Sequence, residues 1–568
     1  MSKKIIQRSE AEHSKANPEP LKILIAVAPF LIGLYYEWTS AVACVFILGY
    51  LWYCFKYTGQ IKIFGTLALT AAVVLSAAYG FSTFWAVDSG MALFGMVKFL
   101  PLPLFVLATE QLAVEQREEL LDYIPISGII MMAASWGLGF IPGFDTYFRV
   151  NERLAGFFQY PNAFALYLLV GVIVLISNQI SQKEWNNTKG LQLLLLFSGI
   201  ILTGSRTGFA LLILTILCFC VLSKDRKVRI GISGAAILLT ASASIYALIT
   251  GNMDSVGRYL TISLSSSTFL GRILYFKDAL PVIMQHPFGL GYEGYYFVQG
   301  SFQTGVYSVV NIHNELLQIL LDVGWIPAGI IAWTVVKGIV SGNMRNRILI
   351  VMIILHSMMD FNLQFVSIFI ILFAAINLNE KNIKKLSKKS LLITATALIG
   401  CVCLYFGGDS ALYYFKMYSA AAQFYPGNTN AWMQLLTETE KAKEMEEIAD
   451  KILVLNPDNP LANNAKARVA YSKGDFSNMI RYKTHALDFY RYDLAEYLDY
   501  FNMLYVGYQI YLGNNDPSSA EVCVEQMREI PERIEKVLEE TDPLAYEIQD
   551  KPELKLPEEY QEILQAIG

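Results

Sequence analysis

Apolar residues lie along the chain in long blocks, which are separated by shorter polar segments. Many blocks have roughly the 20 residues that a helix needs to cross the hydrocarbon layer of a bilayer. Because lipid offers no hydrogen-bond partners, each block must pair its own backbone groups, as a helix does. We therefore predict an all-α, polytopic transmembrane bundle of about 13 spans. The spans cover residues 21–38, 41–55, 63–80, 91–108, 123–140, 162–176, 191–203, 207–222, 230–250, 316–336, 348–359, 366–378 and 391–406.

Basic residues lie in alternate loops between these spans, in segments 3–8, 56–62, 183–189, 224–229, 337–347 and 381–389. Lys and Arg gather in the cytoplasmic loops of membrane proteins. These loops are therefore predicted to share the cytoplasmic side with an N-terminal tail at residues 1–20. Because the number of spans is odd, residues 407–568 are predicted to lie outside. No small-residue cleavage pattern ends the first apolar block, so we expect it to stay as an anchor.

Composition agrees with this membrane assignment and narrows the possible functions. Hydrophobic residues make up 54% of the chain, charged residues only 16%, and the mean hydropathy is +0.40. The formal net charge is −5, and no dense basic stretch is interleaved with aromatic residues, which argues against a nucleic-acid partner. Six of the seven cysteines lie in apolar runs, where they act as small hydrophobic residues, so no disulfide framework or metal site is predicted.

Two outward segments, at residues 141–161 and 251–314, are too long for simple turns, and long loops of this kind are often functional. The predicted transmembrane domain, residues 21–406, includes both. The longer segment contains an amphipathic stretch at 269–284, which is suited to a membrane surface. A sharp turn signal follows at residues 287–291 (PFGLG).

After residue 406 the chain becomes charged and alanine-rich, with apolar residues at helical spacing. The segment 424–428 (FYPGN) recurs as 455–459 (LNPDN), and 473–476 (KGDF) lies where two helices of one unit would turn. This spacing is similar to that of tetratricopeptide repeats, whose unit has about 34 residues. We predict an extracytoplasmic helical-repeat domain at residues 407–568, with an irregular helical bundle as the alternative.

Arginines at the outward ends of spans are the first candidate functional residues, because a charged side chain within the membrane has a high free-energy cost. Arg206 lies between two spans with almost no loop, and no carboxylate is near it in sequence. A ligand phosphate would suit its guanidinium fork, although a helix-capping role is an alternative. Arg272 opens the amphipathic stretch, and Arg258 precedes it. Either could join Arg206 on a pyrophosphate, or could instead contact lipid headgroups.

His313 lies where the long outward segment re-enters the membrane. An imidazole there could take a proton from a sugar hydroxyl, but a lone histidine at a helix start is also a common cap. His356 and Asp360 are four residues apart, so we predict that they share one helix face, where they could orient loop residues or form a structural hydrogen bond within the bundle. Glu293 is an outward acid among tyrosines, which would suit a sugar. No glycine-rich loop or paired acid motif indicates a nucleotide site.

Several motifs occur together in one order along the chain: residues 156–162 (GFFQYPN), 204–206 (GSR), 286–291 (HPFGLG), 313–318 (HNELLQ) and 356–363 (HSMMDFNL). In this order and spacing the chain resembles the O-antigen ligase and polymerase superfamily, in the form that carries C-terminal tetratricopeptide repeats. Each motif is weak alone. The resemblance covers most of the chain and is strongest at residues 162–378.

The resemblance implies a bacterial plasma-membrane glycosyltransferase that needs no cofactor or metal. It would transfer a glycan from an undecaprenyl-pyrophosphate donor to an acceptor hydroxyl on the outer face, with inversion. The family pattern places Arg206 and Arg272 on the pyrophosphate, and we expect Arg258 to join them. The same pattern makes His313 the general base. We expect supporting roles for five further residues: Asn162, Asn314, Glu293, His356 and Asp360.

Several alternatives stay open at this point. A polymerase, a ligase and a protein O-oligosaccharyltransferase differ only in their acceptor, which can be a glycan, a lipid or a protein. The C-terminal repeats could bind the acceptor or a protein partner, since repeat domains form concave surfaces. A transporter or flippase of lipid-linked sugars is the rival from another class, but its charges would lie near the midplane in two similar halves. A non-catalytic scaffold would leave Arg206 unexplained.

Overall fold

The computed structural model describes residues 16–182, 187–222, 226, 229–234, 236–237, 266–376 and 384–567. The chain is 75% helical with almost no sheet, which confirms the predicted all-α class. The first part of the chain forms α2 (Glu19–Val27), η1 (Ala28–Phe30), η2 (Ile32–Leu34), α3 (Glu37–Thr58), β1 (Ile61–Ile63), α4 (Leu67–Ser82), α5 (Ala92–Phe99), α6 (Pro101–Thr109), α7 (Val114–Glu118), α8 (Ile124–Leu138), α9 (Asp145–Phe148), β2 (Arg149–Val150), β3 (Arg153–Leu154), η3 (Gly156–Phe158), α10 (Pro161–Gln182), α11 (Asn187–Leu202) and α12 (Arg206–Leu222).

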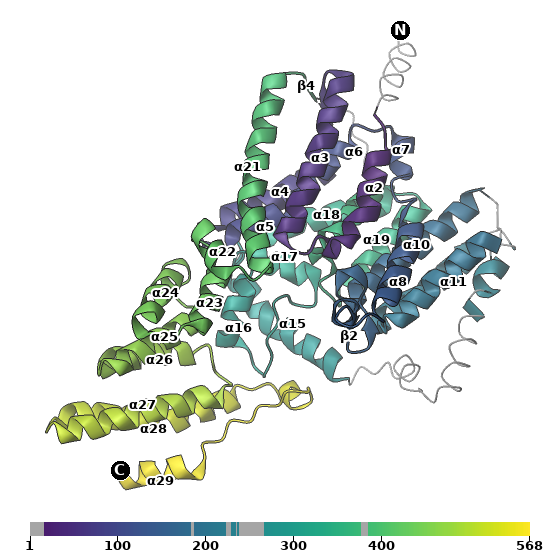
Figure 1. The fold of residues 1–568 in the computed structure, drawn as a ribbon. Coiled ribbons are helices and arrows are strands. Elements are labelled where there is room, and N and C mark those ends of the chain that lie inside the picture. Colours follow the sequence, from purple (N-terminus) through teal and green to yellow (C-terminus); the bar gives the residue numbers. More distant parts are fainter. Residues whose placement is uncertain are drawn as a thin grey trace.

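The second part begins with the described portion of the long outward segment and ends with a set of paired helices (Figure 1). Its elements are α15 (Ser267–Gln285), α16 (Gly294–Phe302), α17 (Glu315–Val323), α18 (Trp325–Ser341), α19 (Met344–Ser357), η4 (Asn362–Gln364), α20 (Val366–Ala375), β4 (Lys384–Leu386), α21 (Lys389–Tyr414), α22 (Tyr418–Phe424), α23 (Thr429–Glu438), α24 (Ala442–Leu455), α25 (Pro460–Ser472), α26 (Phe476–Leu487), α27 (Leu494–Gly513), α28 (Pro517–Glu539), η5 (Pro543–Tyr546) and α29 (Glu558–Ile567).

Four helical stretches among the described residues are long and apolar enough to cross a membrane, namely α3, α5 with α6, α10 and α21. Six shorter apolar helices accompany them: α4, α8, α11, α12, α18 and α20. The multi-pass membrane assignment is therefore supported, whereas the number of about 13 spans stays a prediction. Most of the predicted span 230–250 lies outside the described residues.

Burial differs sharply among the apolar helices. Helix α10 is almost entirely buried and packs against α8, α11, α12 and α19, so it lies at the centre of the bundle. Helix α20 has ten residues, all buried, and at 1.5 Å per residue it is about 15 Å long, half of a hydrocarbon layer. Helix α21 is mostly exposed along its length, as expected of a helix that faces lipid.

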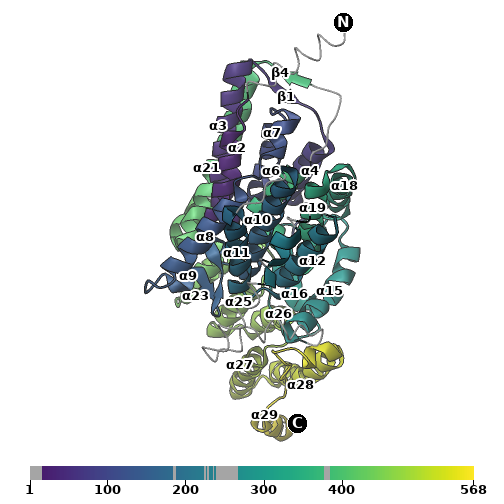
Figure 2. The ribbon, with the colours of Figure 1, turned by 90° about the vertical axis from the view of Figure 1, so that its right-hand side faces the viewer.

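Helices α3 and α21 lie side by side in both views of the molecule (Figures 1 and 2). At one end of the pair, β1 and β4 form an antiparallel two-stranded sheet in which Lys62 lies opposite Lys385. Both strands come from basic loops that were predicted to share the cytoplasmic side. The C-terminal helices follow the opposite end of α21 (Figure 1). The two ends of α21 therefore separate these two basic loops from the C-terminal helices, and the side of the membrane on which each lies stays a prediction.

The C-terminal helices form antiparallel pairs with short turns, and asparagine caps begin two of them. Asn428 accepts from the backbone N–H of Ala431 at 2.9 Å, and Asn459 accepts from Ala462 at 3.0 Å. Such a cap pairs one of the N–H groups that a helix start leaves free. The recurring segments 424–428 and 455–459 thus hold the same cap at equivalent positions. Membership of the tetratricopeptide family stays a prediction.

The C-terminal helices contact the outward segment and the bundle at several places. The Tyr425 hydroxyl donates to the carbonyl of Gly90 at 2.9 Å, and Arg491 donates to the carbonyl of Ser301 at 3.2 Å.

Farther along the C-terminal part, Asp542 pairs with Lys277 of α15. Ala545 and Ile548 pack against Leu274 and Tyr307 in one apolar cluster. The end of the chain therefore holds α15 and the loop after α16 in place.

The turn signal at residues 287–291 forms a close backbone contact with the junction between α17 and α18. Gly289 has φ +80°, and a Cβ there would lie 2.5 Å from the carbonyl carbon of Asp322. Leu290 donates its N–H to the carbonyl of Leu321 at 2.6 Å. Only glycine fits this conformation and this spacing.

Replacing Gly289 by alanine is therefore expected to lower the stability of the folded protein. The left-handed backbone costs about 1–2 kcal/mol, and the clash with the Asp322 backbone adds about 1–3 kcal/mol. The thermal unfolding midpoint of the purified protein in detergent measures the effect. Gly329→Ala is the matched control, because nothing lies within 4 Å of a Cβ at that helical position. Equal midpoints for the two variants would contradict the predicted contact.

Candidate functional site

A buried carboxylate, Asp360, gathers side chains from distant parts of the chain into one cluster. His313 Nδ1 lies 3.2 Å from Asp360 Oδ1, and Arg272 Nη2 lies 3.6 Å from Asp360 Oδ2. The Tyr160 hydroxyl donates to Oδ1 at 2.7 Å, and Asn162 Nδ2 donates to Oδ2 at 2.6 Å. Four of the five residues are among those predicted from the sequence. We call these five residues the Asp360 cluster.

The members of the Asp360 cluster come from four separate parts of the chain. Arg272 lies in the first turns of α15, and Asn162 lies in the first turn of α10. His313 precedes Asn314, which caps α17 by accepting from the N–H of Leu317 at 3.1 Å and donates to the carbonyl of Met358 at 3.0 Å. Asn314 thus joins the loop that carries His313 to the loop that carries Asp360.

Opposing effects set the charge state of Asp360. Burial raises its pKa, but the hydrogen bond and charge of His313 and the charge of Arg272 outweigh burial and lower the pKa well below its usual range. A carboxylate with a lowered pKa stabilises the fold above the ordinary aspartate value, and this contribution is lost as pH falls towards the lowered value. Asp360 is therefore ionised at neutral pH, as the counter-charge for Arg272 and a hydrogen-bond partner for His313.

A chain of hydrogen bonds connects the Asp360 cluster to the turn that begins with Gly204. Arg153 Nη2 donates to Asn162 Oδ1 at 2.7 Å, and Arg153 Nε donates to the carbonyl of Thr203 at 2.8 Å. The turn itself has Gly204 at φ +60°, and its next residues start α12. The segments 153–162 and 203–206, which are far apart in the sequence, are thus brought together.

Arg206 is the first residue of α12, next to this turn, and is half-buried. In the described part of the chain its side chain has no hydrogen-bond or ion-pair partner, so its five donors are available to a ligand. Arg272 also keeps a buried Nε that has no partner within the described residues. Arg258, the third predicted arginine, lies outside the described residues.

The predicted pair of His356 and Asp360 on one helix face is wrong. Helix α19 ends at Ser357, so the spacing of four residues does not place Asp360 above His356. His356 Nδ1 instead lies 2.7 Å from Asn362 Nδ2, and Asp360 contacts the other members of its cluster. The loop is held by Glu315, which accepts from the N–H groups of Leu363 at 2.6 Å and Gln364 at 3.0 Å.

Glu293 does not join the Asp360 cluster but lines a different pocket. It accepts from Asn430 of α23 at 2.8 Å, and Lys98 and Tyr292 line the same pocket. Sequence reasoning missed Lys98, although a charged residue inside the apolar block 91–108 was a usable signal. It also assigned no role to Tyr160 or Arg153.

No group of three His, Cys, Asp or Glu side chains that could hold a metal ion occurs among the residues that the structure describes. The cluster offers one carboxylate, already engaged by four partners, together with cationic groups. This donor set suits an anionic ligand.

In a comparison with protein families, residues 191–333 match the family model described as O-antigen ligase. Arg206, Arg272 and His313 lie inside the matched segment, whereas Asn162 and Asp360 lie outside it. Comparison with curated proteins gives no match. The family match agrees with the resemblance that the sequence motifs indicate. Residues 191–333 are therefore similar to the O-antigen ligase family.

Proposed function

We propose that the protein transfers a glycan from an undecaprenyl-pyrophosphate donor to an acceptor hydroxyl on the outer face of the membrane. The observation that carries this proposal is the Asp360 cluster, in which a partly exposed imidazole and an arginine share one buried carboxylate. The reaction needs a proton acceptor and a cationic site for the leaving pyrophosphate, and these groups supply both.

His313 would act as the general base in this reaction. Its Nδ1 faces Asp360, so Nε2 is left for the acceptor hydroxyl when Nδ1 carries the proton. The acceptor oxygen then forms a bond to the anomeric carbon, and its proton passes to Nε2. The bond from that carbon to the pyrophosphate oxygen breaks, and the electron pair leaves with the pyrophosphate. Attack opposite the leaving group inverts the anomeric configuration.

Arg206 and Arg272 would neutralise the charge that develops on the departing pyrophosphate. Both have donor groups without a partner in the described structure. The Asp360 cluster holds the start of α15, and Arg153 holds the turn that precedes α12. Fixed cationic donors favour the transition state because they need no rearrangement as charge develops. We further propose that residues 407–568 form an extracytoplasmic domain next to this site.

Purified protein in lipid nanodiscs is expected to release undecaprenyl pyrophosphate from an oligosaccharide-linked donor when an acceptor polysaccharide is supplied. Transfer should persist in excess EDTA. Arg206→Ala should lower the rate by about 10²–10³-fold, the usual effect of removing one donor to developing charge. Arg206→Lys should restore part of it, since lysine keeps the charge but lacks the fork.

Arg149→Ala is the matched control, because Arg149 also lies in an outward loop. Its guanidinium carbon is 5.3 Å from the centre of the Phe140 ring, so it is already engaged. This variant should keep full activity. Wild-type protein that moves the intact donor across a bilayer without releasing pyrophosphate lipid would overturn the proposal and indicate a transporter. Loss of transfer in EDTA, with recovery on addition of a divalent cation, would overturn metal independence.

A further inference from the structure

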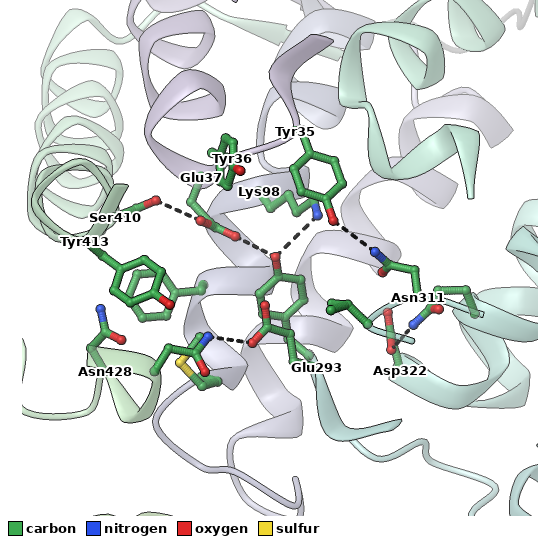
Figure 3. A pocket seen from close by; sticks show the side chains of 16 residues that line it. Tyr35, Tyr36, Glu37, Lys98, Glu293, Asn311, Asp322, Ser410, Tyr413 and Asn428 are labelled. Atoms are coloured by element: carbon green, nitrogen blue, oxygen red, sulfur yellow. Dashed lines mark hydrogen bonds between the residues drawn. The ribbon is translucent and has the colours of Figure 1, made fainter. Parts of the chain in front are cut away.

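A second polar pocket lies between the transmembrane bundle, the outward segment and the first C-terminal helices (Figure 3). Its cavity volume is about 80 Å³. Glu37 and Lys98 come from the bundle, Glu293 and Asn311 from the outward segment, and Tyr413 from the end of α21. The pocket is therefore built by three parts of the chain that are far apart in sequence.

A connected set of hydrogen bonds fixes the polar groups of this pocket. Tyr292 donates its hydroxyl to Glu37 at 2.5 Å and accepts from Lys98 at 3.3 Å. Ser410 donates to the other oxygen of Glu37 at 2.8 Å. Asn311 donates to the hydroxyl of Tyr35 at 3.0 Å, as Figure 3 shows. The side chains are thus held in one arrangement before any ligand enters, which lowers the entropy lost on binding.

The lining favours a neutral, hydroxyl-rich ligand. Three carboxyl groups, from Glu37, Glu293 and Asp322, surround the single ammonium of Lys98, so a pyrophosphate would be repelled. Carboxyl and amide groups accept and donate hydrogen bonds to hydroxyls, and the half-buried ring of Tyr413 offers a face to apolar C–H groups. A pyranose ring presents both kinds of surface, hydroxyls at its rim and C–H groups on its faces.

Two residues of this pocket, Glu293 and Lys98, are held in energetically unfavourable states. Glu293 has φ +59°, a left-handed conformation that a side chain seldom adopts, and burial raises its pKa to about 7 although the Asn430 hydrogen bond acts in the opposite direction. Lys98 is buried, with 2% of its surface exposed. Strained and buried polar groups of this kind persist where the surrounding structure fixes them, and they gather at functional sites.

The pocket is close to the proposed general base. Asn311, which lines the pocket, is two residues before His313, so their Cα atoms are at most about 7 Å apart. The two side chains have different partners: Asn311 bonds to Tyr35, and His313 bonds to Asp360. One short loop therefore connects the reaction site to the pocket.

We infer that this pocket binds one or more sugar units of a glycan substrate, and that Asn430 and Tyr413 complete it from the C-terminal side. The inference rests on the proposed function, because it assigns the pocket to that reaction's donor or acceptor glycan. It gives the C-terminal helices a direct part in substrate binding.

The test uses the full-length protein in detergent and a soluble oligosaccharide that mild acid releases from the host's polyprenyl-pyrophosphate pool. Isothermal titration calorimetry should detect binding to the wild type. Asn430→Ala and Tyr413→Leu should each raise the Kd by about 10-fold or more, the effect of losing one good contact. Asn502→Ala is the matched control, an exposed asparagine on α27 that should bind as the wild type does.

Steady-state kinetics then separates the two sources of the glycan. A rise in KM for the acceptor alone assigns the pocket to the acceptor, and a rise in KM for the donor alone assigns it to the donor chain. Oligosaccharide binding without any transfer would contradict the proposed function, but it would still support the inference that the pocket binds sugar units. Undetectable binding to the wild type, or an unchanged Kd in both folded pocket variants, would overturn the inference even if transfer still depended on His313.

Discussion

Replacing His313 by alanine is expected to lower the rate of glycan transfer by about 10²–10⁴-fold, which is the usual contribution of a positioned general base. The fall should appear in kcat, because the imidazole takes up a proton only as the transition state forms. Single-turnover assays with the lipid-linked donor measure this step directly. Added imidazole should restore part of the rate, since it can enter the space that the side chain leaves.

Two comparisons distinguish a base from a structural histidine. His286→Ala removes an exposed imidazole from the same outward segment, and it should leave kcat unchanged. The thermal unfolding midpoint of His313→Ala should stay close to that of the wild type, because the ring is partly exposed, with 20% of its side-chain surface accessible. Full activity in a folded His313→Ala protein would eliminate the general-base role.

Replacing Asp360 by alanine is expected to impair both folding and transfer. The carboxylate is 98% buried and has four side-chain partners, so its removal leaves Arg272 in a site without a counter-charge. Breaking a buried ion pair in this way costs about 3–5 kcal/mol. The midpoint of thermal unfolding should fall, and transfer by the protein that remains folded should also fall because His313 loses its orienting partner.

Asp360→Asn is the conservative variant that separates these two effects. The amide keeps the size of the side chain and can still accept from Tyr160, so the loss of stability should be smaller than with alanine. It removes the negative charge beside His313 and Arg272, so kcat should stay low. In a double-mutant cycle, Arg272→Met should cost less stability when Asp360 is already asparagine. Independent effects of the two substitutions would rule out the proposed ion pair.

The sequence predicted much of the site because charge is rare in a chain of this composition. Arg206, Arg272, His313 and Asp360 each stood out as polar residues near the ends of apolar blocks, and the structure places three of them together. The same reasoning identified the long segment at residues 251–314 and the change from apolar to charged, alanine-rich sequence after residue 406. Helical periodicity and apolar block length were sufficient for these predictions.

The contacts that complete the cluster depend on tertiary structure that no local pattern reveals. His356 and Asp360 were expected to share a helix face, but α19 ends at Ser357 without any proline or glycine to mark the end. The loop that follows is held by Glu315, about 50 residues earlier in the sequence. Tyr160 and Arg153 likewise acquire their roles only when α10 and the turn at Gly204 come together.

The pairing of β1 with β4 has a consequence for the order of events during synthesis. Ile61 pairs with Leu386, 325 residues later, so the first strand must wait for the synthesis of more than half of the chain. At about 5–20 residues per second this wait is on the order of 20–60 s. Until α21 emerges, the flank of α3 that α21 covers is open to lipid or to an insertion chaperone. Closure of the bundle is therefore a late step, and the C-terminal helices reach the outward segment only after it.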